Sequence, residues 1–357
     1  MPGLSSTRAT PYVAVDLDVL EANIAAMEAS ATARGLAMRP HVKTHKCLEI
    51  ARRQVAAGAT GITVATVAEA EVFVDAGFPD VFIAYPLWVD AARGARLRAL
   101  AGRAALRVGV ESVDGARTVA RHAGHDTVDV LVEVDSGHHR TGVPPERAGQ
   151  VAEAATDAGL QVRGVFTFPG HSYAPGQTVT AAGDEASALR IAADALRAAG
   201  LEPDVVSGGS TPSAGSTNGD VLTEMRPGVY VFNDAQQFEL GSARPGQVAL
   251  TVLATVVSRT DDRIVLDAGS KVLGADRPSW ATGFGRLLDH LEARVVELSE
   301  HHATVTFPAD ALPRLGEVVR IMPNHVCAAV NLVDDLVIVR RGREIDSWPV
   351  AARGANT

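Results

Sequence analysis

The stretch GITVATVAEAEVFVDAGFPDVFIAY, residues 61–85, shows the pattern that decides the fold of this chain. It holds an apolar run at 61–65, a segment of helical period at 67–76 and a second apolar run at 81–85. Short runs that are apolar throughout are typical of strands buried on both faces, and helices join such strands in parallel sheets. The stretch therefore predicts one strand–helix–strand unit.

The same alternation continues on both sides of this unit. Segments of helical period lie at 17–34, 147–158 and 184–199. The predicted strands end near Lys43, Ala65, Tyr85, Val110, Asp135, Thr167, Val206 and Tyr230. Eight buried strands that are separated mostly by helices predict a closed (β/α)8 barrel. A doubly wound open sheet is the structural alternative, but no Gly-x-Gly-x-x-Gly follows the first strand, which disfavours a dinucleotide-binding fold.

The pattern changes after about residue 238, where long helical segments stop. The strands predicted beyond this point are 247–257, 263–267, 290–298, 303–306, 317–321 and 336–340. We therefore expect a barrel domain over residues 17–238 and a mostly β domain over residues 239–357. The isolated strand predicted at 10–16 precedes the barrel and is assigned to the β domain.

The composition excludes several classes of protein. The chain of 357 residues has a net charge of −9, so nucleic acid and anionic membrane surfaces are not expected partners. No apolar run is long enough for a membrane-spanning helix, and the first residues lack the features of a signal peptide. Only two cysteines occur, Cys47 and Cys327, which argues against a disulfide framework. The expected location is the cytoplasm.

The segment Arg39-Pro40-His41-Val42-Lys43-Thr44-His45-Lys46 places two lysines among other basic side chains. The only other lysine in the chain is Lys271. Arginine stays protonated, whereas a lysine beside other cations can lose its proton and attack a carbonyl carbon. Lys43, which follows the first barrel strand, is therefore the candidate reactive amine. The alternative is a pair of ordinary surface lysines.

The loop after the seventh predicted strand has the composition of a phosphate-binding loop. In a (β/α)8 barrel, the reactive groups lie where the strands end, and phosphate sites recur after strand seven. The loop reads Ser207-Gly208-Gly209-Ser210-Thr211, in which glycines expose backbone N–H groups and hydroxyls add further donors. The alternative is a flexible turn.

Other loops at the same end of the barrel contribute single candidates. Arg140 lies in the acid- and histidine-rich loop 133–142 and could hold the phenolate oxygen of an aromatic cofactor, or form an ordinary salt bridge. The adjacent His138 and His139 have no third metal ligand at a suitable spacing, so we expect them in solvent. Tyr173 could stack on a ligand or simply pack.

Arg226 and Tyr230 close the last predicted barrel strand. Either side chain could point into the barrel mouth, and the sequence leaves the choice between them open.

His325-Val326-Cys327 is a candidate metal pair in the β domain. In an extended chain, residues two apart share a face, so the imidazole and the thiolate could bind one ion. Histidine with cysteine suits Zn²⁺, and two protein ligands leave positions open for substrate or water. The alternative is an incidental pair, because most metal sites have more protein ligands.

Taken together, these motifs resemble those of the D-serine dehydratase and D-threonine aldolase family of pyridoxal-phosphate enzymes. The resemblance covers nearly the whole chain and is most specific at 39–46, 170–173, 207–212 and 323–327. It implies an alanine-racemase-like (β/α)8 barrel followed by a C-terminal β domain. Many relatives carry a histidine before the Gly-His-Ser-Tyr turn, where this chain has Phe168.

The resemblance also implies roles for individual residues. Lys43 would bond covalently to pyridoxal phosphate, Arg140 would face its phenolic oxygen, and Tyr173 would lie near cofactor and substrate. The residues expected to contact the cofactor are Lys43, Arg140, Tyr173, Ser207, Gly209, Ser210, Thr211, Arg226 and Tyr230. By this resemblance, dehydratases of the family have His-x-Cys with Zn²⁺, whereas aldolases of the family have His-x-Asp. His325 and Cys327 therefore place this chain with the dehydratases.

The activity implied by the resemblance is a pyridoxal-phosphate- and zinc-dependent dehydration of a D-β-hydroxy amino acid, with D-serine as the leading substrate. The products would be a 2-oxo acid and ammonia. The alternatives are a D-threonine-type aldolase that gives glycine and an aldehyde, a D-threo-3-hydroxyaspartate dehydratase, an amino-acid racemase, and a non-catalytic pyridoxal-phosphate carrier. Enzymes of this architecture resemble homodimers.

Overall fold

The computed structural model describes residues 8–307 and 312–357. The chain forms two compact units that are interleaved along the sequence. The barrel unit comprises Met27–Lys43, Ala51–Gly228 and Ala355–Thr357, and the β unit comprises Met1–Ala26, Thr44–Ile50 and Val229–Gly354. The limits expected from the sequence, 17–238 and 239–357, stay a prediction about domain organisation.

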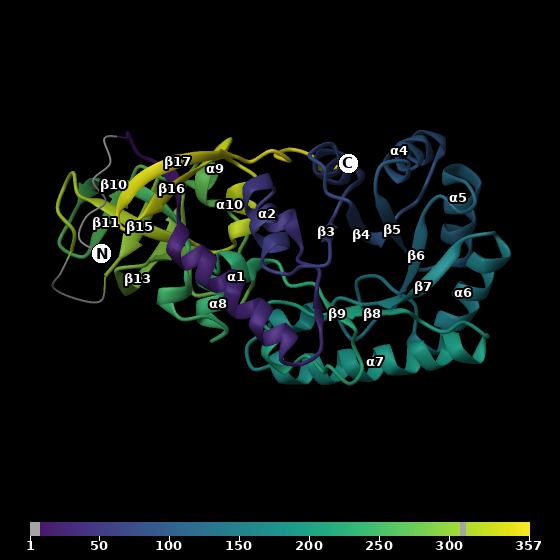
Figure 1. The fold of residues 1–357 in the computed structure, drawn as a ribbon. Helices are drawn as coiled ribbons and strands as arrows, with labels where there is room; N and C mark the ends of the chain where they lie inside the picture. Colours follow the sequence, from purple (N-terminus) through teal and green to yellow (C-terminus); the bar gives the residue numbers. More distant parts are fainter. Residues whose placement is uncertain (1–7, 308–311) are drawn as a thin grey trace. The chain divides into compact units, whose positions relative to one another are not determined.

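The barrel unit is built on a parallel sheet of eight strands in the order β2-β9-β8-β7-β6-β5-β4-β3 (Figure 1). The strands are β2 (Ala37–Met38), β3 (Ile62–Val64), β4 (Asp80–Pro86), β5 (Ala105–Val110), β6 (Asp129–Glu133), β7 (Gln161–Phe166), β8 (Val205–Gly208) and β9 (Glu224–Met225). A bridge between His41 and Thr63 joins the two edges, and Thr63 N donates to the Pro40 carbonyl at 2.9 Å. The sheet therefore closes, and the predicted (β/α)8 barrel is confirmed.

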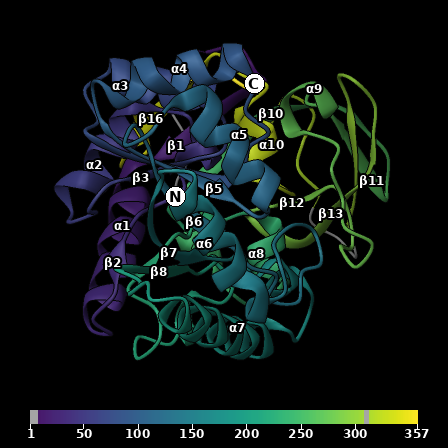
Figure 2. The same cartoon turned by 90° about the vertical axis from the view of Figure 1, so that its right-hand side faces the viewer.

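Helices cover the outside of this sheet (Figure 2). They are α3 (Val67–Asp75), α4 (Ala91–Ala101), α5 (Val113–Ala123), α6 (Ala148–Asp157) and α7 (Thr178–Ala198), while α1 (Leu17–Thr32) and α2 (Leu48–Ala56) contain residues of both units. Thr66, Asp90 and Ser112 begin the first three with side chains that accept a backbone N–H. Such N-caps satisfy donors that have no partner within the helix.

The barrel interior contains an apolar layer and an ionic layer. The apolar layer consists of Phe82, Leu131 and Phe166, all fully buried. In the ionic layer, Arg39 donates to Glu224 at 2.9 Å and to both carboxylate oxygens of Asp80 at 2.7 and 3.0 Å. Only 2 % of the Arg39 side chain is exposed, so this pairing is what makes burial of the charge tolerable. The barrel is a packed core, and ligands are expected only beyond its strand ends.

Two barrel strands end earlier than the sequence suggested. β2 and β9 are each two residues long, and a proline lies two residues after each of them. Proline lacks a backbone N–H and so ends the ladder of hydrogen bonds. Lys43 and Tyr230 consequently lie in short 3-10 helices, η1 (Val42–Thr44) and η5 (Val229–Val231), and not at strand ends.

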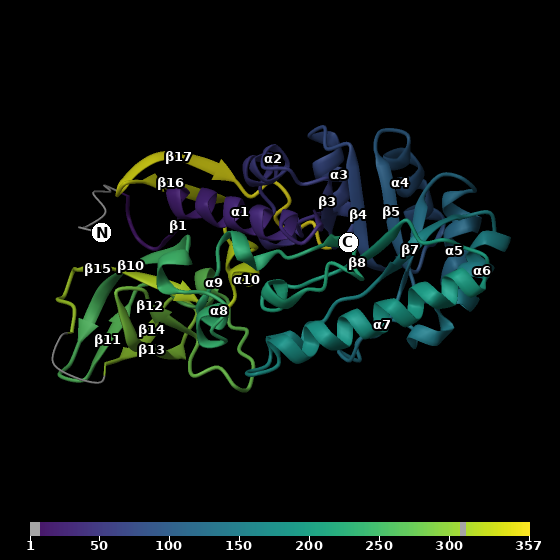
Figure 3. The same cartoon turned by 60° about the horizontal axis from the view of Figure 1, so that its bottom comes forward.

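The β unit carries a mostly antiparallel sheet of nine strands in the order β11-β14-β13-β12-β15-β10-β1-β16-β17 (Figure 3). They are β1 (Tyr12–Asp16), β10 (Leu250–Arg259), β11 (Arg263–Leu266), β12 (Gly285–Leu287), β13 (His290–Leu298), β14 (Ala303–Thr306), β15 (Val318–Pro323), β16 (Asp335–Arg340) and β17 (Arg343–Pro349). An extra pairing of β10 with β11 closes six of these strands into a second, smaller barrel. β1 pairs with β10 and β16, so the first strand of the chain takes its hydrogen-bonding partners from the last third of the chain.

The other helices of the β unit are short: α8 (Ala235–Glu239), α9 (Ser270–Leu273) and α10 (Val326–Val330). Within the described part of the chain, no helix combines the length and the apolar character needed to cross a bilayer.

Candidate active site

Lys43 and Arg140 meet around one aromatic side chain at the carboxyl ends of the barrel strands. Lys43 is half-buried, and its Nζ lies 5.9 Å from the ring centre of Phe168, which follows β7. The guanidinium carbon of Arg140, from the loop after β6, lies 5.2 Å from the same ring centre. Both distances fall within the range of cation–π attraction. The structure thus brings two of the predicted cofactor residues together.

Phe168 also contacts a third predicted residue. The rings of Phe168 and Tyr173 lie 6.2 Å apart with a tilt of 40°, and the ring of His138 meets Phe168 edge-on at 5.8 Å. The sequence marked Phe168 only as a departure from relatives, and its position directly after a strand end was the signal that could have identified it. Phe168 is therefore the common neighbour of Lys43, Arg140 and Tyr173.

The two adjacent histidines differ in their surroundings. His139 is exposed, as expected, and its Nδ1 lies 2.6 Å from Asp135 Oδ2. His138 is partly buried, contrary to expectation, because it turns toward Phe168. Burial, together with the charge of Arg140, lowers the pKa of His138 below its ordinary value. The pair therefore does not act as one unit.

The turn after β8 carries a buried cluster of hydroxyls. Ser210 Oγ lies 2.8 Å from both Ser172 Oγ and Ser213 Oγ, and all three side chains are buried. We call these three residues the hydroxyl cluster. Thr211, beside them, is also buried. Hydroxyl hydrogens rotate freely, so the cluster can redirect donors toward an anion. Ser172 and Ser213 were not predicted.

The turn is also shaped by its glycines. Gly209 has φ = +81°, and a Cβ added there would lie 3.0 Å from the Cβ of Met225. Only glycine adopts this conformation readily, and a bare backbone leaves room for a ligand to approach. Together with the hydroxyl cluster, this geometry fits the phosphate of the expected cofactor.

Ser207 and Arg226 form a separate pair inside the barrel. Ser207 Oγ donates to Glu224 at 2.7 Å and accepts from Arg226 Nε at 2.8 Å. The Arg226 guanidinium lies over the rings of Phe82 and Phe166, and burial lowers the pKa of this arginine. Ser207 thus holds Arg226 in place and does not join the hydroxyl cluster. Arg226 is buried under the strand ends, which suits contact with the ring of a cofactor.

Glu133, at the end of β6, is a buried acid that the sequence analysis did not select. Its Oε1 accepts from Thr141 Oγ1 at 3.0 Å, and among the described residues its buried Oε2 has no partner. Glu133 lines a small cavity together with Arg140 and Phe168. Burial raises the pKa of Glu133 to about 7, and Glu111 adds to this shift. The group can therefore exchange a proton near neutral pH.

His325 and Cys327 lie at the start of α10 in the β unit. The expectation that they share the face of an extended strand is wrong, because His325 is the N-cap and Cys327 is in the first turn of this helix. Their side chains are nevertheless within hydrogen-bonding reach of each other. Cys327 Sγ also lies 3.4 Å from Thr44 Oγ1.

The surroundings of His325 fit a metal ligand. Its Nδ1 lies 2.5 Å from Asp276 Oδ2, which leaves Nε2 for a metal, as is usual for ligating histidines. Burial alone would lower the pKa of His325, but Cys327, Asp276 and Asp234 raise it well above the ordinary value, so metal binding would displace a proton. No group of three or more His, Cys, Asp or Glu residues in the described ranges converges on one point. The site therefore offers two protein ligands.

Tyr230 belongs to the β unit, where it is buried on η5 and its carbonyl accepts from Asn233 Nδ2 at 3.3 Å. Its predicted contact with the cofactor stays a prediction.

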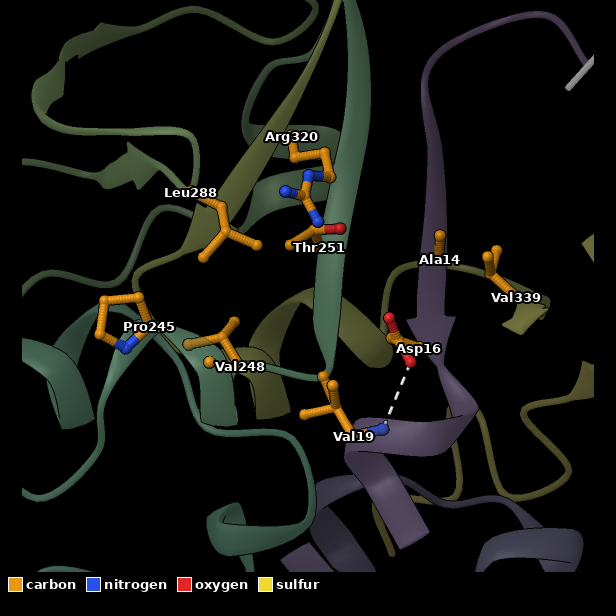
Figure 4. Close-up of a pocket in the computed structure, with 11 residues that line it drawn as sticks. Ala14, Asp16, Val19, Pro245, Val248, Thr251, Leu288, Arg320 and Val339 are labelled. Atoms are coloured by element: carbon orange, nitrogen blue, oxygen red, sulfur yellow. Dashed lines mark hydrogen bonds between the residues drawn. The ribbon is translucent and has the colours of Figure 1, made fainter. Parts of the chain in front are cut away.

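The β unit also contains a cavity of about 350 Å³, lined by residues of β1, β10, β15 and β16 and of the segments beside them (Figure 4). Apolar side chains such as Val19, Val248 and Leu288 line it, and Asp16 lies at one side with its carboxylate on Val19 N at 3.3 Å. None of the residues predicted to hold cofactor or metal lines this cavity.

Comparison with known families covers most of the chain. The family model described as alanine racemase, N-terminal domain, matches residues 15–236, which is more than half of the chain. A serine dehydratase domain model matches residues 249–339. The two matches follow the order of barrel and β domain expected from the sequence.

Several characterised relatives match nearly the full length. D-threo-3-hydroxyaspartate dehydratase from Delftia sp. is 37 % identical over 89 % of this chain and 91 % of its own length. D-threonine aldolase from Arthrobacter sp. is 36 % identical over 97 % and 93 %. The crystal structure of D-threonine aldolase from Filomicrobium marinum superimposes with a TM-score of 0.88 at 34 % identity, covering 98 % of this chain and 97 % of that one. The chain therefore belongs to the alanine-racemase-like family of pyridoxal-phosphate-dependent lyases that act as D-amino-acid dehydratases and aldolases.

Proposed function

We propose that this protein is a pyridoxal-phosphate- and zinc-dependent dehydratase of a D-β-hydroxy amino acid, with D-serine as the first substrate to test. The observation that carries the proposal is the placement of Lys43 and Arg140 around Phe168 at the strand ends of the barrel. The choice of dehydratase over aldolase rests on His325 and Cys327, because the family's dehydratases resemble this chain in having His-x-Cys.

The barrel residues would hold the cofactor. Lys43 would bond to its aldehyde carbon, the hydroxyl cluster and Thr211 would bind its phosphate, and Arg140 and Arg226 would contact its ring substituents. When bound, pyridoxal phosphate supplies an electron-withdrawing ring that makes the α-proton of an amino acid acidic. The Nζ of Lys43 would accept that α-proton.

A divalent metal on His325 and Cys327 would help the β-hydroxyl to leave. When bound, Zn²⁺ acts as a Lewis acid and is worth several kcal/mol of charge stabilisation. A mutant of a D-threo-3-hydroxyaspartate dehydratase has been solved in a metal-free form, which supports a metal in that relative. Lys43 Nζ would then return its proton to the departing hydroxide, which leaves as water, and the released enamine would hydrolyse to a 2-oxo acid and ammonia. The water that is lost in the elimination is taken up again in the hydrolysis, so the overall reaction converts the amino acid to a 2-oxo acid and ammonia.

Two other substrates compete with D-serine in this proposal. The Delftia relative is named for D-threo-3-hydroxyaspartate, and a Paracoccus denitrificans relative is a 3-hydroxy-D-aspartate aldolase at 29 % identity. A β-carboxylate would need a basic partner in addition to Arg140, which this proposal assigns to the cofactor. Aldol cleavage of D-threonine is the second candidate reaction, favoured by the Arthrobacter and Filomicrobium relatives.

One assay separates these reactions. The purified protein is incubated with D-serine, D-threonine and D-threo-3-hydroxyaspartate, and ammonia, 2-oxo acid and glycine are measured. The dehydratase proposal predicts equal amounts of ammonia and 2-oxo acid without glycine. If glycine and an aldehyde are the main products, the protein is an aldolase and not a dehydratase. Racemised substrate without either set of products would contradict both the dehydratase and the aldolase.

We further propose a cytoplasmic homodimer. The resemblance to enzymes of this architecture supports the dimer, and the low cysteine content, Cys47 and Cys327 alone, supports a reducing compartment. A monomer mass in sedimentation analysis would contradict the dimer.

A further inference from the structure

We propose that Glu185 is the positioning residue of the turn after β8, and that its charge state controls how well this turn binds an anion. This inference rests on the proposed function, in which the turn receives the phosphate of the cofactor.

Glu185 reaches the turn from the middle of α7, the long helix that runs beside β7 and β8 (Figure 3). Its carboxyl is completely buried, and Oε1 accepts the backbone N–H of Gly209 at 2.5 Å. A Cβ placed on Gly208 would lie only 2.3 Å from the same oxygen. A side chain at Gly208 would therefore require the Glu185 carboxyl to move, because this carboxyl occupies the space where the side chain would be. The position of the turn therefore depends on Glu185.

This contact changes which groups of the turn can bind phosphate. The N–H of Gly209, a predicted phosphate donor, is already used by Glu185. The donors that remain are the hydroxyl cluster and Thr211, which surround the same turn. The phosphate contact expected of Gly209 is therefore better assigned to these hydroxyls, while Glu185 holds the backbone of Gly209.

A carboxylate beneath a phosphate site creates a conflict of charge. The second oxygen, Oε2, is buried and has no partner within the described residues, so an ionised Glu185 would carry an uncompensated lone pair in the protein interior. A proton on this carboxyl removes both problems. Burial raises the pKa of Glu185 to about 7, although the bond from Gly209 and the charge of Arg226 each act to lower it.

Anion binding at the turn should depend on pH through the charge of Glu185. Glu185 is neutral below about pH 7 and gains a negative charge above it, so anion binding should weaken as the pH rises. Arg226, after β9, is the charged group that faces Glu185. His171, on η3 (Gly170–Tyr173), packs near α7 with its Nε2 3.2 Å from Asp184.

Sulfate binding to the full chain freed of cofactor tests this inference, because sulfate keeps its charge throughout the range. Calorimetry at pH 6.0 and 8.5 should show wild-type affinity falling by about tenfold. Glu185→Gln, which keeps an oxygen for Gly209 N–H, should lose most of this fall and bind sulfate more tightly at pH 8.5. Glu185→Ala should loosen the turn and weaken sulfate binding at both pH values. Glu153→Gln, an exposed glutamate on α6, is the matched control and should behave as wild type.

The outcomes separate this inference from the proposed function. If Glu185→Gln shows the wild-type fall between the two pH values, Glu185 does not control the site and the inference is overturned. If Ser210→Ala leaves sulfate binding unchanged, the anion does not bind at this turn, and the phosphate assignment fails with it.

Discussion

The turn after β8 and the metal pair of the β unit differ in how completely the protein satisfies them. At the turn, hydroxyls bond to one another and Glu185 holds the backbone, so almost every polar group has a partner before a ligand arrives. At the candidate metal pair, His325 bonds to the Asp276 carboxylate, and within the described residues no group of three or more His, Cys, Asp or Glu is placed to hold a metal. The comparison indicates that the turn is preorganised, whereas a metal on the pair would depend on substrate or water to complete its coordination.

The largest loss of activity should come from removing the candidate reactive amine, Lys43, because neither the turn after β8 nor the metal pair can do its chemistry. Lys43→Ala should reduce ammonia release from D-serine by at least about 10³-fold, because both cofactor attachment and α-proton removal are lost. Steady-state assays measure this directly. Lys46→Ala is the control, since Lys46 is buried with its Nζ on Asn331 at 2.9 Å and should affect stability more than turnover.

Metal removal should give the next largest effect and should affect only one of the two regions. Chelation, or Cys327→Ala, should lower elimination by about 10²-fold or more while the cofactor absorbance is unchanged. The preorganised turn keeps the cofactor without help from the metal pair. Full activity in a sample shown by elemental analysis to contain no metal would remove the metal from the mechanism.

A smaller effect should follow from the aromatic ring between the barrel candidates. Phe168→Leu should weaken pyridoxal phosphate binding by about 3- to 30-fold, because Lys43 and Arg140 lose a common cation–π partner. Fluorescence titration measures the change. Phe78→Leu removes a similar ring that packs on Phe73 at 5.3 Å, away from the candidate site, and should leave cofactor affinity unaltered. Equal losses in both variants would point to general destabilisation.

The smallest effect concerns stability. Burial raises the pKa of Glu133 and of Glu185 to about 7 from 4.5, so the folded state binds more protons than the unfolded state between these values. Stability should therefore fall as pH rises from about 4.5 to 7 and then level off. Replacing both acids by glutamine should flatten this fall in thermal unfolding followed from pH 5 to 8. An unchanged slope would show that neither group is protonated in the fold.

Much of the fold could be predicted because its strands are buried on both faces. β3 and β6 are short, largely apolar runs followed by segments of helical period, and this pattern has few other solutions. β17 was missed because its side chains are almost all exposed, so no apolar alternation marks it. β12 was missed because it is only three residues long and gains its place from pairing with β13 and β15. Such strands are defined by their neighbours and not by their own residues.

The candidate site was predictable where chemistry depends on residue type within a short segment. Lys43, the glycine-serine turn and the His325–Cys327 pair each stand out locally. The supporting groups do not, because they come from distant segments: Asp276 lies 49 residues from His325, and Glu185 lies 24 residues from Gly209. Nothing in a helix of ordinary composition reveals that one of its glutamates turns inward under a loop.

The most direct test of the account is to locate the cofactor on the chain. The protein has three lysines, Lys43, Lys46 and Lys271, so borohydride reduction with bound pyridoxal phosphate, followed by peptide mass spectrometry, gives an unambiguous answer. The account predicts the pyridoxyl label on Lys43 alone. A label on Lys46 or Lys271, or none on Lys43 in a protein that retains cofactor absorbance, would contradict it.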